Sequence, residues 1–236
     1  MSTPDLLSFQ KEKRHIRYMN RLIEILPHLL EEGRTAAVTV AVARVGSAPT
    51  PAEACLIVTS DSVRGTLGGG QVEAEMILRS RAAIADGIAR LSEFSFDSDT
   101  VRPQSMLCGG RITFFTYLAR PSMDSRKFWS AAAALSGRGG RAWLVTAVLE
   151  GGAGGAESWH LLVESGRAVA GRLPERAWEE AVTGQLSGVE DFRDTVFIKP
   201  EKSPAAWPGL AGFLVEPLQP EPSLLICGGG HIGLAL

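Results

Sequence analysis

LIVTSDSVRGTLGGGQVEAE, residues 56–75, is the stretch that decides the fold class. It continues the short apolar run CLIVTS (55–60), which is typical of a buried strand, and residues 61–62 then indicate a turn. Three glycines follow, and the pattern becomes helical from 71 to 86, with Gly87 as a candidate C-cap. A strand, a glycine loop and a helix in succession predict an α/β fold.

The flanking segments extend this α/β pattern in both directions. Residues 8–32 repeat apolar side chains at the spacing of an amphipathic helix, and Gly33 is placed to end it. The run AAVTVAVARV (36–45) is apolar and β-branched, which indicates a buried strand. RITFFTYL (111–118) predicts a further strand.

A faint internal repeat relates residues 35–118 to residues 140–218. The aligned segments are 41–46 with 147–152, 56–60 with 161–165, Gly65 and Leu67 with Gly171 and Leu173, 72–87 with 174–188, and 108–118 with 208–218. The repeat predicts two related α/β halves packed together, and chance similarity between two α/β segments is the alternative. Only the first half carries glycine motifs, because the second has Pro174-Glu175 and Pro208-Gly209 at those places.

Composition excludes several classes of protein. The chain has 236 residues, 45% hydrophobic and 21% charged, with a net charge of -2, so it has material for a core and no general affinity for nucleic acid. No stretch approaches the length of a membrane span, and the polar start is wrong for a secretory signal. Three cysteines without paired spacing are not a disulfide framework, so a cytoplasmic location is expected.

The last segment, PSLLICGGGHIGLAL (222–236), breaks the repeat. An apolar strand pattern leads into Gly228, Gly230 and Gly233, which fit the dinucleotide fingerprint G-x-G-x-x-G. The sequence stops before the rest of such a domain, so we expect a truncated Rossmann start. The expected divisions are 1–34, an N-terminal helix; 35–120, the first half; 121–220, a degenerate second half with a linker; and 221–236, the Rossmann start.

The glycine loop is the first candidate site. Gly68, Gly69 and Gly70 permit a close approach of the backbone to a ligand, and they stand where a helix start favours an anion such as a phosphate, or a pterin edge. Glu73 and Glu75 would repel an anion, so they are expected to cap the helix or to contact donors of a ligand. A tight turn needed only for packing is the alternative.

The second candidate is Cys108, which precedes Gly109 and Gly110 at a loop-to-strand junction. A soft thiolate there would suit molybdenum, copper or zinc, and a buried, inert thiol is the alternative. Cys55 lies inside an apolar run and is expected in the core. His160 belongs to no ligand spacing, so it is expected to be structural or at the surface.

In this order the motifs resemble the XdhC/CoxI family, accessory proteins of xanthine dehydrogenase and related molybdenum hydroxylases. The stretches that carry the resemblance are 38–49, 56–75, 106–115 and 213–233. The resemblance implies a protein that binds molybdenum cofactor, helps its sulfuration, protects it and inserts it into an apo-enzyme. The cofactor site that it implies comprises Ser47, Gly68, Gly69, Gly70, Glu73, Cys108, Gly109 and Gly110, with Cys108 as a molybdenum contact.

Three substitutions relative to the family pattern keep another function open. Thr50 stands where the family usually has an arginine, Glu53 where it has a glycine, and Cys55 at a basic position. Losing the guanidinium removes a bidentate phosphate contact, which favours a docking scaffold that binds no cofactor. The fingerprint alone would suggest an NAD(P)-linked oxidoreductase. A carrier that is not itself an enzyme remains the leading expectation, with an apo molybdenum hydroxylase and a cysteine desulfurase as partners, and self-association into a homodimer through the unpaired strand edge.

Overall fold

A computed structural model describes residues 7–10, 22–46, 54–96, 110–138, 142–149, 158–187, 195–200 and 210–218. Within these ranges the chain forms two antiparallel sheets and four helices. The α/β fold expected from the sequence is therefore confirmed. No helix among these residues is long and apolar enough to cross a membrane.

The first sheet has five strands in the order β4-β3-β2-β6-β5, and every neighbouring pair is antiparallel. A short helix precedes this sheet along the chain, and a long helix connects β4 to β5. The elements are α2 (Ile25–Glu31), β2 (Ala36–Gly46), β3 (Cys55–Val58), β4 (Val63–Thr66), α3 (Gly70–Asp86), β5 (Arg90–Ser95) and β6 (Gly110–Ala119).

The second sheet has the order β1-β10-β11-β7-β8-β9, again with antiparallel neighbours only. Apart from β1, its elements follow one another along the chain in the same succession as those of the first sheet. They are β1 (Leu7–Gln10), α4 (Met123–Gly137), β7 (Ala142–Leu149), β8 (His160–Glu164), β9 (Arg167–Arg172), α5 (Arg176–Leu186), β10 (Val196–Pro200) and β11 (Leu210–Leu218).

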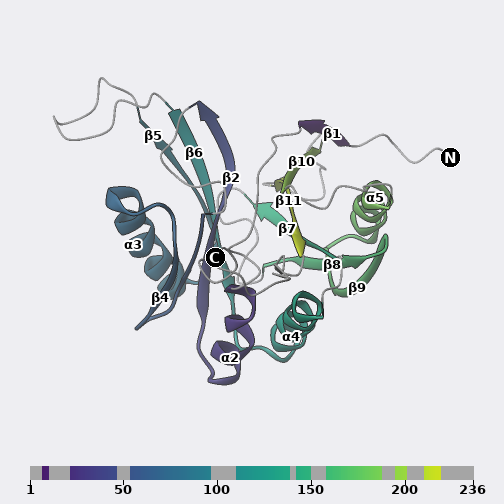
Figure 1. Ribbon diagram of the computed structural model, residues 1–236, viewed down its shortest axis with the longest axis horizontal. Coiled ribbons are helices and arrows are strands. Elements are labelled where there is room, and N and C mark those ends of the chain that lie inside the picture. The colour runs from purple at the N-terminus through teal and green to yellow at the C-terminus, as the bar shows by residue number, and fades with distance from the viewer. Residues whose placement is uncertain are drawn as a thin grey trace, which may run out of the picture.

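The two sheets share one core. Figure 1 shows α3 outside the first sheet, α5 outside the second, and α2 beside α4 between them. The inner faces of both sheets and these two middle helices form a single apolar cluster, in which Leu26, Leu30 and Trp129 are almost fully buried. The outer faces pack separately, with Met76 of α3 in one cluster and Trp178 of α5 in another. Because successive residues of a strand point to opposite faces of its sheet, each sheet has one apolar face toward the shared core and one toward its outer helix.

The strand orders support the predicted internal repeat. When β1 is left out, the two sheets have equivalent strand orders, β4-β3-β2-β6-β5 in the first and β9-β8-β7-β11-β10 in the second. In each half, one helix precedes the central strand along the chain and another follows the hairpin. The equivalence extends to single residues. A Cβ built on Gly65 would lie 2.3 Å from the carbonyl oxygen of Cys55, and one on Gly171 would lie 2.3 Å from that of His160.

The structure corrects two of the sequence alignments. Val38 pairs with Tyr117 on β6, and Leu144 pairs with Glu216 on β11, so Tyr117 corresponds to Glu216, one residue away from the predicted match. The β2-β6 pairing shifts register between Ala41 and Ala43, and the β11-β7 pairing shifts register between Leu210 and Gly212. An alignment of the two halves at constant spacing therefore does not match the equivalent residues. The helices also match differently: α3 begins at Gly70 and α5 at Arg176, four residues from the predicted alignment.

The helix predicted over 8–32 is only partly correct. Ile25–Glu31 is helical, and Gly33 follows it with φ +76°, as a residue after a helix C-cap often does. Leu7–Gln10 instead forms β1, which pairs antiparallel with β10. Hydrogen bonding to an open sheet edge outweighs local helix periodicity here.

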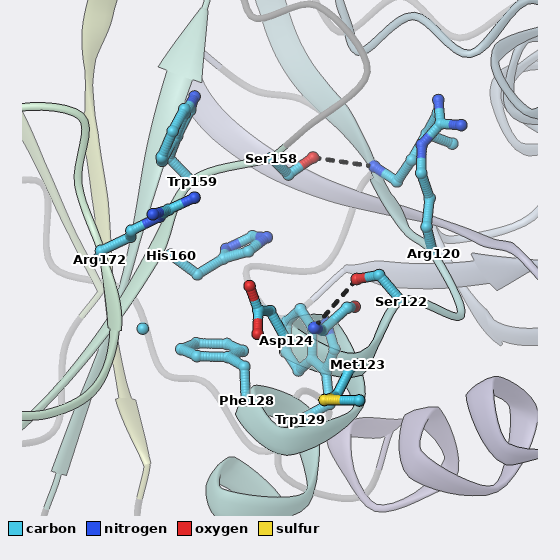
Figure 2. A pocket seen from close by; sticks show the side chains of 13 residues that line it. Arg120, Ser122, Met123, Asp124, Phe128, Trp129, Ser158, Trp159, His160 and Arg172 are labelled. Atoms are coloured by element: carbon cyan, nitrogen blue, oxygen red, sulfur yellow. Dashed lines mark hydrogen bonds between the residues drawn. The ribbon is translucent and has the colours of Figure 1, made fainter.

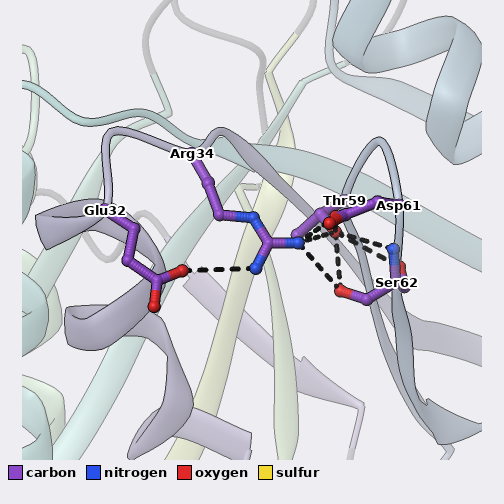
Figure 3. Close-up of polar contacts among 5 residues, drawn as sticks. All are labelled: Glu32, Arg34, Thr59, Asp61 and Ser62. Carbon is purple, nitrogen blue, oxygen red and sulfur yellow. Dashed lines mark hydrogen bonds and ion pairs between the residues drawn. The ribbon is translucent and has the colours of Figure 1, made fainter.

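A polar cluster ties α2 to the turn between β3 and β4 (Figure 3). The Arg34 guanidinium, just after α2, donates to Thr59 Oγ1 at 2.8 Å, to the Asp61 carboxylate and to Ser62 Oγ at 3.2 Å. The Thr59 hydroxyl, followed by the Arg34 guanidinium, lowers the pKa of the Asp61 carboxyl. This cluster fixes the hairpin that leads into the glycine loop.

Candidate functional site

The glycine loop forms the start of α3. Gly68, Gly69 and Gly70 have φ values of +102°, +78° and +71°, a region that favours glycine over other residues. Gly69 is the N-cap of the 17-residue helix. Cβ atoms built on Gly69 and Gly70 would meet nothing within 4 Å. The loop therefore leaves open space above the N-terminal end of a long helix, where partial positive charge favours anions.

Glu73 turns its carboxylate back onto this loop. Its Oε2 accepts hydrogen bonds from Thr66 Oγ1 at 2.6 Å, from the Leu67 amide at 2.7 Å and from the Gly69 amide at 3.0 Å. The Gly68 amide donates to Thr66 Oγ1 at 3.0 Å. The Thr66 hydroxyl above all, and then the two amides, hold the pKa of Glu73 below its usual value. Of the two roles left open by the sequence, the structure gives Glu73 the capping role.

The second half repeats this contact without the glycines. The Leu173 amide donates to Glu179 Oε1 at 2.8 Å, which matches the bond from Leu67 to Glu73. A glutamate in the first helical turn is therefore part of the repeated scaffold, whereas Gly68, Gly69 and Gly70 are specific to the first half. The glycines remain the part of this loop for which packing gives no account.

Gly110, the remaining described residue of the predicted cofactor site, belongs to the same end of the first sheet. β2 and β4 both run antiparallel to β3, and β6 runs antiparallel to β2. The ends of β2 and β4 and the start of β6 therefore lie at one end, where Gly46 pairs with Gly110. Gly110, the last residue of the CGG motif, is the first residue of β6.

Several predicted site residues lie outside the described part of the chain. Ser47, Cys108 and Gly109 flank the Gly46 and Gly110 pair in sequence but are not among the described residues. The fingerprint residues Gly228, Gly230 and Gly233 and the departures Thr50 and Glu53 are outside it too. Within the described ranges, no group of three or more His, Cys, Asp or Glu side chains could hold a metal ion.

Cys55 is a core residue, as expected from the apolar run that contains it. It is 2% exposed, and burial raises the pKa of its thiol well above the usual value. A thiol held neutral in an apolar interior is a poor nucleophile and a poor metal ligand. Cys55 is therefore not a candidate for cofactor chemistry.

A separate concave site lies where the two halves meet. A cavity of about 400 Å³ opens between the start of α4, the end of β6 and the β8-β9 hairpin. Figure 2 shows Trp159 and Arg172 on one side, Arg120 and Ser122 on the other, and the His160 ring between them. Sequence reasoning treated His160 as structural or at the surface, and it missed this cavity because its residues come from three separate segments.

His160 is buried among aromatic rings. It is 8% exposed, and its ring centroid lies 4.8 Å from that of Tyr117, 5.0 Å from that of Trp129 and 5.4 Å from that of Phe128. Its Nδ1 lies 3.1 Å from Thr146 Oγ1, and its Nε2 is buried without a hydrogen-bond partner among the residues that the structure describes. Burial lowers the pKa of His160 to about 3, so the ring is neutral at physiological pH.

Glu216 is a second buried ionisable group that sequence reasoning missed. It is 3% exposed, one of its carboxylate oxygens has no hydrogen-bond partner within the described ranges, and burial raises its pKa to about 8. It stands on β11 between Leu214 and Leu218, which face the shared core. That period-two position was the available signal, because alternate residues of a strand share a face.

The fold and the site define an internally duplicated α/β protein whose first half carries an open glycine loop at a helix start. A family model described as the XdhC and CoxI family matches residues 29–95, from α2 to the end of β5, and includes the glycine loop and Glu73. The resemblance to that family is confirmed over this part of the chain.

One solved structure supports the fold over most of the molecule. The crystal structure of a xanthine dehydrogenase from Bacillus halodurans at 2.80 Å resolution superposes with a TM-score of 0.56 and 13% sequence identity. The superposition covers 84% of this chain and 52% of that chain, so this chain spans about half of its length. No curated protein matches the chain.

Proposed function

We propose that this protein is an accessory factor of a xanthine dehydrogenase-type molybdenum hydroxylase, and that it binds molybdenum cofactor and delivers it to the apo-enzyme. The observation that carries the proposal is the family match over residues 29–95, which contains the open glycine loop. The cofactor is cargo here. An apo molybdenum hydroxylase would receive it, and a cysteine desulfurase would supply sulfur.

The geometry of the loop suggests how a phosphate of the cofactor would bind. Glu73 already takes the amides of Leu67 and Gly69, so a phosphate would use the amides at the start of α3 itself, beside Gly70. The absence of side chains at Gly69 and Gly70 permits the approach. The thiol of Cys108, two residues before Gly110, is proposed as the metal contact, since a soft thiolate suits molybdenum.

A reconstitution experiment tests this proposal. The full chain is incubated with released molybdenum cofactor, and molybdenum and pterin are measured after gel filtration. We expect about one cofactor per chain for the wild type and a loss of tenfold or more for Gly69→Leu, whose side chain would cover the loop. Gly33→Leu is the matched control, because Gly33 has φ +76° and the same open surroundings far from the loop.

The outcomes separate the parts of the proposal. Loss of binding in Cys108→Ala would support a thiol contact, whereas unchanged binding would remove Cys108 and keep the carrier. Equal binding by Gly69→Leu and Gly33→Leu would remove the glycine loop as the site. Failure of the wild type to retain cofactor would overturn the carrier function.

One observation favours a docking scaffold as the second candidate. The ionised carboxylate of Glu73 occupies two amides of the loop and would repel a phosphate. A scaffold would bind the apo molybdenum hydroxylase with the same affinity whether or not cofactor is present, and would itself retain neither molybdenum nor pterin. Surface plasmon resonance against the apo-enzyme distinguishes the two functions.

A further inference from the structure

The cavity beside His160 is separate from the glycine loop. It is lined by Leu118, near the end of β6, whereas Gly110 begins that strand at the glycine-loop end of the sheet. At about 3.3 Å per residue, the eight-residue step from Gly110 to Leu118 spans about 26 Å. A ligand of a few ångströms could not occupy both places, so the cavity needs its own explanation.

The contact between Thr146 Oγ1 and His160 Nδ1 is compatible with either tautomer of the ring, and we assign the proton to Nε2 because this lets the buried Thr146 hydroxyl donate. Thr146 is 0% exposed, so its hydroxyl needs an acceptor, and the His160 Nδ1 at 3.1 Å is the partner that it has. Nδ1 therefore accepts, and the neutral ring carries its hydrogen on Nε2. The buried Nε2–H has no partner in the described part of the chain, although its residue lines the cavity. An acceptor that reaches Nε2 from the cavity would satisfy it.

The other polar groups of the cavity are mainly donors. One terminal guanidinium nitrogen of Arg120 donates a hydrogen bond to the Gly87 carbonyl oxygen at 2.9 Å, but the buried Nε of Arg120 has no partner among the described residues. Arg172 lies over the Trp159 ring at 5.3 Å on the opposite side. α4 starts here too, with the Ser122 hydroxyl accepting from the Ser125 amide. Asp124 is the acidic residue of the lining, so two guanidiniums outweigh one carboxylate and favour an anion.

Three of the five apolar side chains of the lining are aromatic. Phe128 stacks on His160 with an angle of 26° between the rings, Trp129 meets His160 edge-on, and Trp159 stands at the rim. Phe128 and Trp129 are buried against these neighbours, whereas Trp159 is half-buried, so Trp159 offers the aromatic face that a planar ligand can lie against. The volume of about 400 Å³ falls in the range of small-molecule pockets.

The first half shows that the fold does not require these residues. A Cβ on Gly171 would meet the Phe128 ring, and a Cβ on Gly65 would meet Leu22, so Leu22 stands where Phe128 does. By strand register, Cys55 and Thr66 pair as His160 and Arg172 do. The same architecture is built there from an aliphatic side chain, a thiol and a hydroxyl. The imidazole, the guanidinium and the aromatic ring are therefore particular to the second half.

We propose that this cavity binds a small planar aromatic carboxylate, with one carboxylate oxygen accepting the His160 Nε2–H and the ring lying against Trp159. Arg120 and Arg172 supply the positive field that attracts the anion. This site is independent of the glycine loop, so it stands or falls separately from cofactor delivery.

Indole-3-carboxylate is the probe. It is titrated into the full chain labelled with ¹⁵N at histidine, and the side-chain resonances of His160 are followed by NMR. We expect an Nε2–H tautomer in the free protein and a saturable shift of that resonance with a Kd of about 1 mM or lower. Indole-3-carboxamide keeps the ring but loses the charge, and we expect it to bind at least tenfold more weakly.

Three variants complete the test. His160→Phe keeps an aromatic ring and removes the donor, and it should weaken indole-3-carboxylate at least tenfold in a folded protein. Arg172→Gln, at the exposed rim, should weaken it about threefold or more, while Arg126→Gln, on α4 outside the lining, should leave it unchanged. If His160→Phe does not fold, the binding of indole-3-carboxylate to Arg172→Gln and the binding of the carboxamide to the wild type test the proposal.

Three results would overturn the proposal: no saturable shift up to about 10 mM, equal binding of the carboxamide, or the same weakening by Arg126→Gln as by Arg172→Gln.

Discussion

At the level of single residues, the same glutamate contact occurs in the glycine loop of the first half and at the equivalent place of the second half, which lacks the glycines. Glu73 receives the amides of Leu67 and Gly69, and Glu179 receives the amide of Leu173. Both cap a helix whose N-cap residue supplies no side-chain hydrogen bond. A glutamate beside a glycine loop is thus explained by helix capping before any ligand is considered.

Replacing Glu73 with alanine should destabilise the protein more than replacing Glu179. Glu73→Ala leaves two amides and the Thr66 hydroxyl without their acceptor, whereas Glu179→Ala leaves one amide without its acceptor. By analogy with lost caps, we expect the free energy of unfolding to fall by about 1–2 kcal/mol for Glu73→Ala and by about 1 kcal/mol or less for Glu179→Ala. Urea unfolding measures both.

Glu75→Ala is the control for this comparison, because Glu75 lies in the same part of α3 and, among the described residues, has its ion pair with Arg79 at the surface of the helix. Its effect should stay within about 0.5 kcal/mol. Equal effects at positions 73 and 75 would contradict the capping role of Glu73.

Among the elements, the two outer hairpins depend on a glycine at the same place. Gly65 on β4 and Gly171 on β9 have φ +85° and +79°, and a Cβ on either would lie 2.3 Å from a backbone carbonyl oxygen of the neighbouring strand. A backbone contact cannot relax by rotating a side chain. These glycines therefore set how closely the hairpin strands approach.

Alanine substitutions should rank these glycines by steric surroundings. Gly33 has φ +76° but nothing within 4 Å, so Gly33→Ala should cost only the strain of the positive φ, about 1 kcal/mol. Gly65→Ala and Gly171→Ala add a backbone clash and should each cost about 3 kcal/mol or more. Chemical denaturation gives the ranking, and similar losses at all three positions would show that the hairpins open without cost.

The Arg34 cluster should control the local opening of the β3-β4 turn. Arg34→Ala removes the donor shared by Thr59, Asp61 and Ser62, while Thr59 keeps its own bonds to the turn. We expect faster amide hydrogen exchange at Ser62 and at Thr59, whose amide bonds to the Ser62 carbonyl. Exchange in the β8-β9 hairpin of the other half should be unchanged, and an effect of equal size there would indicate global destabilisation instead.

How far the sequence predicts the elements depends on how local their causes are. Apolar and β-branched runs predicted β2, β3 and β6, and the helical spacing after the glycines predicted α3 with its Gly87 cap. β1 could not be predicted in this way, because its strand form depends on pairing with β10 far along the chain. The bulges that shift the repeat by one residue are likewise tertiary features without a strong local signal.

For the candidate site, local motifs again carried further than spatial groupings. The glycine loop and Glu73 were found because they are contiguous in sequence. The cavity was not, because Arg120, Phe128 and His160 come from a strand end, a helix and a hairpin. A lone histidine gives no sign of its neighbours until the chain is folded.

At the scale of the whole molecule, duplication creates a shared interior in which equivalent positions carry different groups. Tyr117 and Glu216 occupy the same place in the two halves, and both are buried with an oxygen that lacks a partner in the described part of the chain. Burial raises the pKa of Tyr117 well above its usual value, as it does that of Glu216. Burial in the interior therefore favours the neutral form of both groups.

His160 and Glu216 together should give the folding stability a flat optimum in mildly acidic solution. Between the unfolded Glu value of 4.5 and its folded value of about 8, the native state keeps a proton that the unfolded chain has lost, so stability falls as pH rises. Between about 3 and the unfolded His value of 6.5, the unfolded chain gains a proton that native His160 refuses, so stability falls as pH drops. The two slopes cancel from 4.5 to 6.5.

Outside that interval one slope remains on each side, at about 1.4 kcal/mol per pH unit, and the loss should reach about 2 kcal/mol at pH 8 and at pH 3. Urea unfolding across pH 3–9 measures the profile. Glu216→Gln should flatten it above pH 6.5 while keeping the acid limb, and His160→Phe should remove the acid limb while keeping the alkaline fall. An unchanged alkaline limb in Glu216→Gln would contradict the role of Glu216, because the proton held at pH 7 would then belong to another group.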